Sequence, residues 1–177
     1  MTIWLTGLAK LLGVCKSRRG ESLSYWVRPT TADVGIRAFG LNCNDLVREM
    51  TVGMQSILLA DGQDLNALTR KVARWEVSHD GDRDILIVKW LDEVLFRAEV
   101  HNEFLLECRP MIRDGMIEAQ VSYVSKDDVQ VEVEIKAVTT HEFVFKKVGG
   151  GEVITSPWPE VPTFEGEGWY GDVVFDI

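Results

Sequence analysis

The sequence predicts an α+β fold: a single domain of mostly antiparallel sheets with two amphipathic helices. Two segments repeat their apolar residues at helical spacing, and seven or eight others alternate apolar and polar residues at the spacing of strands. Most of the strand-like segments follow one another without a helix between them, which favours this fold class over alternating strands and helices. At 177 residues, the chain is long enough to bury a sizeable core.

The first part of the domain is predicted to hold two strands and a helix. Residues 25–27 indicate a short strand before a turn at Pro29, and residues 33–39 alternate with a period of two. Asn42 can cap the helix that follows, with Asp45 three residues further on. The helix is predicted over 43–60, where apolar residues recur at helical spacing.

The rest of the domain is predicted as a second helix and a series of strands. Asp82 and Asp84 begin this helix, where acidic side chains suit the positive end of the helix dipole. Residues 149–168 are predicted to form a Gly/Pro-rich loop, of a length that in compact domains is functional or disordered. The strands are predicted over 69–78, 103–112, 115–124, 129–138, 142–148 and 169–177.

Composition narrows the class of protein. A net charge of −9 argues against a broad face for binding nucleic-acid phosphates, and favours a basic protein or a metal ion as partner. The 3 cysteines are odd in number and lack CxxC spacing, so we expect no disulfide framework or zinc site and a reduced, cytoplasmic location. No apolar run reaches the roughly 18 residues of a membrane-spanning helix.

Residues 1–22 differ from the rest of the chain. A short apolar stretch comes first and Lys16, Arg18 and Arg19 follow it, which reverses the order of a secretory signal peptide. We therefore expect an N-terminal extension over 1–22, outside the core, and a domain over 23–177.

Carboxylates at the two ends of the domain form the candidate site. The last strand ends on Asp176 and Ile177, which offer a side-chain carboxylate and the α-carboxylate, and Asp33 stands where an early strand begins. If these ends meet, three carboxylates make an oxygen cage suited to Ca²⁺, Mg²⁺ or Mn²⁺ rather than zinc. Otherwise Asp33 is a turn residue and Asp176 belongs to a solvated face.

Other polar residues leave several function classes open. Lys136 stands beside Glu134, either in a cross-strand charge pair or as a cation directed at a phosphate or an acidic site. The three histidines lack metal-ligand spacing, and only His141 offers a general base. A metal-dependent phosphoester hydrolase and a chaperone-like binding module with an incidental ion are therefore alternatives.

Four blocks, in order along the chain, resemble the archease family. They are Thr-Ala-Asp-Val-Gly-Ile-Arg-Ala-Phe-Gly at 31–40, Trp-Leu-Asp-Glu-Val-Leu-Phe at 90–96, Glu-Ile-Lys-Ala-Val-Thr-Thr-His at 134–141 and Val-Phe-Asp-Ile at 174–177. The resemblance covers about 25–177. It departs from the family at Pro29-Thr30, where the family usually has Glu-His.

This resemblance implies a small α+β accessory protein, not an enzyme. Archeases assist the GTP-dependent tRNA-splicing RNA ligase by promoting guanylylation of the ligase histidine and multiple turnover, which implies a protein partner and only indirect contact with RNA. The resemblance further implies that Asp33, Asp176 and the Ile177 carboxylate bind a divalent cation, often Ca²⁺. It also implies that Lys136 contributes to activation.

Overall fold

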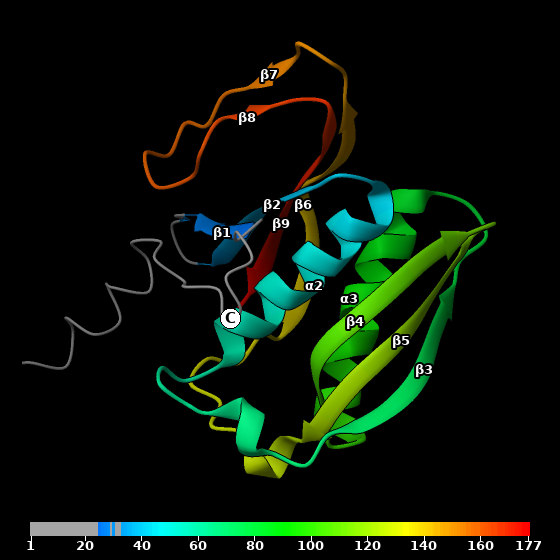
Figure 1. Ribbon diagram of the computed structural model, residues 1–177, viewed down its shortest axis with the longest axis vertical. Coiled ribbons are helices and arrows are strands. Elements are labelled where there is room, and N and C mark those ends of the chain that lie inside the picture. Colours follow the sequence, from blue (N-terminus) through cyan, green and yellow to red (C-terminus); the bar gives the residue numbers. More distant parts are fainter. Residues whose placement is uncertain (1–24, 29, 31–32) are drawn as a thin grey trace, which may run out of the picture.

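Two helices lie between two β-sheets in the computed structural model, which describes residues 25–28, 30 and 33–177 (Figure 1). α2 (Cys43–Leu58) contacts strands of both sheets, and so does α3 (Arg83–Val100). This arrangement confirms the predicted α+β class with two helices and antiparallel sheets. The predicted extension over 1–22 and the Pro29 turn lie outside the described residues.

The four-stranded sheet has the order β1-β2-β9-β6, and every neighbouring pair is antiparallel. Its last strand in sequence, β9, therefore lies in the interior of the sheet, with an early strand on one side and a late strand on the other. One face of this sheet packs its apolar residues against the helices. The strands are β1 (Tyr25–Arg28), β2 (Val34–Gly40), β9 (Gly168–Asp176) and β6 (Ala137–Val148).

The second sheet has the order β3-β5-β4, also antiparallel. Residues such as Trp75 and Ile117 pack inward from it, while Val72 is exposed on its other face. A two-stranded hairpin, β7-β8, lies within the segment predicted as a loop over 149–168. These strands are β3 (Lys71–Ser78), β5 (Met116–Ser125), β4 (Glu103–Arg113), β7 (Val153–Ile154) and β8 (Phe164–Glu165), and the short 3₁₀ turns are Leu65–Ala67 and Lys126–Asp128.

Both helices begin where the sequence predicts, at Asn42 and at Asp82. The Asn42 side-chain oxygen accepts a hydrogen bond from Asp45 N at 3.0 Å, and Asp82 accepts from Asp84 N at 2.9 Å. These bonds satisfy main-chain donors that the first turn of a helix leaves without partners. Deeper in the core, a hydrogen bond across the helix interface joins Trp90 Nε1 of α3 to an α2 hydroxyl at 2.9 Å.

The prediction of a strand over 129–138 is wrong for residues 129–136. In this segment Val131 forms only an isolated bridge with Leu59, just beyond the end of α2, and a continuous strand begins only at Ala137. From there β6 runs through the strand predicted over 142–148, with an irregularity in its pairing to β9. Alternation is typical of a strand, but a ladder also requires a neighbouring strand, and among the described residues only the bridge to Leu59 pairs with residues 129–136.

A buried ion pair joins the two central strands on the outer face of the four-stranded sheet. Arg37 of β2 lies opposite Asp172 of β9, and its Nε and Nη2 donate to the two carboxylate oxygens at 2.8 and 2.6 Å. The hydrogen bonds that Arg37 donates to Asp172 raise the pKa of Arg37 above its ordinary value, against the opposing effect of burial. This bidentate geometry fixes β2 and β9 in one register.

Replacing Asp172 with Asn is expected to reduce the free energy of unfolding by about 3 kcal/mol, because it leaves the Arg37 charge buried without a counter-ion. Urea denaturation measures the change. The matched control is Arg74→Met, which breaks the exposed Arg74–Glu118 pair and should cost less than about 1 kcal/mol. Equal losses in the two variants would contradict a special role for the buried pair.

Candidate functional site

Sheet register brings the two acidic ends of the domain together. Val34 pairs with Phe175 at the end of the β2–β9 ladder, so the next position sets Asp33 opposite Asp176. Side chains at such opposed positions of antiparallel strands have Cβ atoms roughly 4.5–5.5 Å apart. Ala137 of β6 pairs with Asp176 from the other side. The geometry that the sequence left open, a meeting of the two ends, is therefore a consequence of β9 lying beside β2.

Lys136 reaches the same edge of the sheet from the position just before β6. Its main-chain N donates to Asp176 O at 2.8 Å, and its Nζ donates to Ile177 O at 2.9 Å. Within the described part of the chain, the ion pairs do not include one between Lys136 and Glu134. The lysine thus lies with the candidate carboxylates rather than in the alternative pair.

The donor atoms at this edge are suited to a hard cation. Asp33 and Asp176 are both exposed and each supplies a carboxylate, and Ile177, which follows Asp176 in sequence, has its O hydrogen-bonded to Lys136. Oxygen donors of this kind suit Ca²⁺, Mg²⁺ or Mn²⁺. Among the described residues, no group of three or more His, Cys, Asp and Glu side chains is placed to hold a metal. A third carboxylate would therefore have to come from Ile177.

Helix α3 holds the beginning of β6 at this edge. Asp92 Oδ1 accepts a hydrogen bond from Val138 N at 3.3 Å, two residues after Lys136. Burial raises the pKa of the Asp92 carboxyl, and the hydrogen bond from Val138 acts in the opposite direction. Because Asp92 is on the helix and Val138 on the strand, this contact helps position the segment that carries Lys136.

The Archease protein family (MTH1598/TM1083) matches residues 25–177. The chain belongs to the archease family. It is also similar to the solution structure of protein 1598 from Methanobacterium thermoautotrophicum, with a TM-score of 0.56 and 20% identity over 88% of this chain and 100% of that one. At that identity the likeness shows the fold alone. No curated protein matches the sequence.

In this archease, described residues from each of the four sequence blocks lie at one end of the four-stranded sheet. The first contributes β2, the last contributes the end of β9, the third leads into β6, and the second supplies Asp92 from α3. Archeases are accessory proteins that act with RNA-processing proteins. None of the helices in the described part of the chain is long and apolar enough to cross a membrane.

The histidines of this archease are dispersed. His141 is 81% exposed at the irregular part of β6, with Nε2 3.8 Å from Glu142 Oε1. His79 lies after β3, with Nδ1 3.1 Å from Lys89 Nζ, and His101 packs edge-on against Phe96 after α3. The one histidine considered as a general base is therefore a solvated side chain.

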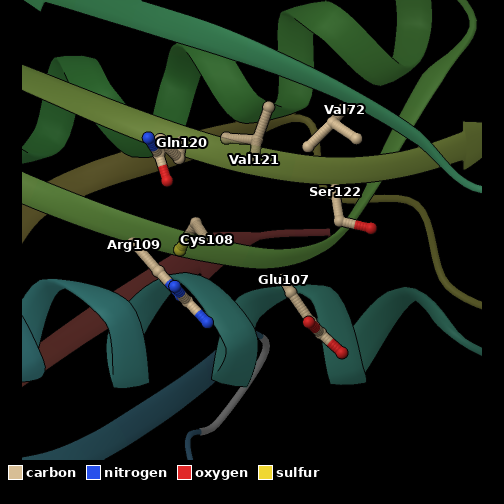
Figure 2. A pocket seen from close by; sticks show the side chains of 7 residues that line it. All are labelled: Val72, Glu107, Cys108, Arg109, Gln120, Val121 and Ser122. Carbon is tan, nitrogen blue, oxygen red and sulfur yellow. The ribbon is translucent and has the colours of Figure 1, made fainter.

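A pocket of about 210 Å³ lies on the three-stranded sheet, and the sequence did not indicate it. Figure 2 shows the side chains from β3, β4 and β5 that line it. Its one thiol belongs to Cys108, and burial raises the pKa of that thiol to about 12. The thiol therefore stays protonated at neutral pH and is not an activated nucleophile. The lining residues are Val72, Glu107, Cys108, Arg109, Gln120, Val121 and Ser122.

Cys108 is expected to resist a thiol-specific disulfide reagent in the native protein at pH 8, because its pKa is about 12 and only 3% of the residue is exposed. Spectrophotometric thiol counting on a Cys15→Ser variant tests this. Cys43, which is partly exposed, serves as the internal control and should react first. Cys108 should react only after denaturation, and simultaneous reaction of both thiols in the native state would contradict the expectation.

Proposed function

We propose that this archease is a metal-binding accessory protein that activates the GTP-dependent tRNA-splicing RNA ligase. It would promote guanylylation of the ligase histidine and multiple turnover. The observation that supports the proposal is the register of β2, β9 and β6. It brings Asp33, Asp176 and Lys136, which donates a hydrogen bond to Ile177 O, to one edge of the sheet. Membership of the archease family supports the accessory role.

In this proposal Asp33, Asp176 and the Ile177 carboxylate hold the divalent cation, with Ca²⁺ favoured and Mg²⁺ or Mn²⁺ as alternatives. The cation would supply positive charge that offsets the triphosphate of GTP bound to the ligase. The exposed position of these residues suits a site that is presented to another protein. The net charge of −9 favours a protein partner and only indirect contact with RNA.

Lys136 has two roles at this site. Its hydrogen bond to Ile177 O orients the carboxyl end of the chain beside Asp176. Its ammonium is also a compact point charge of the same sign as the cation, so it adds to the attraction for phosphate oxygens. Both effects depend on the position of Lys136 immediately before β6, which Asp92 helps to fix.

Asp33→Asn and Asp176→Asn should each weaken binding of Ca²⁺ by at least about tenfold, equivalent to about 1.4 kcal/mol, because each removes a charged oxygen ligand. Isothermal titration calorimetry measures the affinity. The same variants should lose stimulation of ligase guanylylation in an assay with labelled GTP. Asp80→Asn, which changes an exposed carboxylate elsewhere, is the matched control and should behave as the unmodified protein.

An added Gly-Ser after Ile177 tests the third ligand, because it moves the α-carboxylate away from Asp176. Cation affinity and ligase stimulation should both fall, whereas removal of residues 1–22 should leave them unchanged. Full stimulation by both Asp variants and by the extended chain would contradict the proposal and favour a binding module with an incidental ion. Phosphoester hydrolysis by the protein alone, abolished by a chelator, would favour the hydrolase alternative instead.

Lys136→Gln should reduce ligase stimulation more than it changes Ca²⁺ affinity. The hydrogen bond to Ile177 O both orients that group and competes with the cation for it, so these effects on affinity oppose each other, whereas the charge directed at phosphate oxygens is lost. Calorimetry and the guanylylation assay give the two readings. Lys147→Gln is the matched control, since Lys147 is an exposed lysine on β6, the strand that Lys136 immediately precedes. Equal stimulation by the Lys136 and Lys147 variants would contradict a role for Lys136 beyond surface charge.

A further inference from the structure

Two buried arginines face one tryptophan on the outer face of the four-stranded sheet. Arg28 of β1 is 4% exposed and Arg37 of β2 is 6% exposed. Their guanidinium carbons lie 5.0 and 5.1 Å from the ring centroid of Trp158, which belongs to the segment between β7 and β8. The tryptophan therefore covers both guanidinium groups, and cation–π attraction holds it there.

The hydrogen bonds of the two guanidinium groups leave three donor nitrogen atoms without a partner among the described residues. Arg37 donates hydrogen bonds from Nε and Nη2 to Asp172, and Arg28 donates one from Nη1 to Glu142 Oε2 at 2.9 Å. Arg28 Nε, Arg28 Nη2 and Arg37 Nη1 are buried and have no hydrogen-bond partner among the described residues. Burying donors of charged groups without partners is costly, so a ligand that accepts from them would gain free energy.

The unused donors of Arg28 form a complete fork. Nε and Nη2 are the two parallel donors with which a guanidinium binds two oxygens of one anion. On β2, Gly35 lies opposite Arg28, and a Cβ there would come within 2.7 Å of Nε, so the arginine lies flat across β2. Arg37 is two residues from Gly35 on the same face, a diagonal neighbour within reach of Arg28.

We propose that Arg28 and Arg37 form a binding site for a phosphate group of a small anion, closed by Trp158. Three donors from two guanidinium planes suit a tetrahedral group with three terminal oxygens better than a planar carboxylate with two. The phosphate belongs either to inorganic phosphate or to a nucleotide. The site uses neither the carboxylates of the proposed cation site nor a partner protein, so it does not depend on the function proposed above.

Glu142 is the internal competitor for this site. Its side chain is 55% exposed, whereas that of its partner Arg28 is 4% exposed, so the carboxylate can turn into solvent when an anion enters. Asp172 is buried and stays with Arg37, which keeps the second guanidinium in place. Loss of the Glu142 charge should therefore strengthen phosphate binding, whereas a purely structural role for Arg28 predicts no such gain.

Isothermal titration calorimetry of the full chain in the presence of a chelator, first with inorganic phosphate and then with GTP, tests the proposal. Arg28→Lys keeps the charge but removes the fork, and should weaken binding at least about tenfold. Glu142→Gln should tighten binding several-fold, and Trp158→Ala should tighten it by opening the site. Arg113→Lys, at an exposed arginine at the end of β4, is the control and should leave the affinity unchanged.

Tighter binding of GTP than of phosphate, with equal sensitivity to Arg28→Lys, assigns the site to a nucleotide. Equal affinities assign it to free phosphate. The proposal is overturned if neither the unmodified protein nor Trp158→Ala binds either anion, or if Arg28→Lys binds as Arg113→Lys does. Circular dichroism checks that each variant is folded, and if Arg28→Lys is not, the direction of the Glu142→Gln change decides.

Discussion

The position of β9 between β2 and β6 is the constraint on which the rest of the structure depends. It joins the last strand of the chain to one of the first strands, so the sheet closes only when sequence-distant segments meet. A slip of one residue would turn Asp172 into the core and Val173 out of it. The bidentate pair of Arg37 with Asp172 opposes such a slip, because a buried charge without its partner is far more costly than a lost surface contact.

This register also explains why polar residues collect on one face of the four-stranded sheet. Asp33, Gly35 and Arg37 alternate along β2 and its approach, and Asp172 and Asp176 alternate in the same way along β9. The opposite face carries Ile36, Val173 and Phe175, which are fully buried against the helices. One strand pairing therefore determines both the apolar core and the polar face, and each depends on the other.

Local features of this fold were predictable from the sequence, and long-range partners were not. The caps at Asn42 and Asp82 depend on bonds within three residues, so the sequence pattern identified both helix starts. The segment over 129–138 alternates cleanly, but its residues 129–136 form only the bridge to Leu59 as strand pairing among the described residues, which alternation cannot reveal. The sequence offered the juxtaposition of Asp33 and Asp176 as one of two alternatives for the ends of the domain. It gave no sign of the contacts of Trp158 with Arg28 and Arg37, because these join residues more than 100 positions apart in the chain through a segment without regular structure.

The electrostatics of the polar face follow from the same arrangement. Carboxylates at the sheet edge repel one another, so Asp33 and Asp176 favour a cation or a lysine between them, and Lys136 already donates to the neighbouring Ile177 O. Two residues further along β2, Arg28 lies across Gly35 with its fork unused. Positive groups therefore stand on both sides of the acidic edge. A polyphosphate with its divalent cation has the complementary pattern of charge, because its metal needs carboxylate oxygens while its terminal oxygens need N–H donors. The sheet offers both kinds of group on one face, within the length of two strand residues.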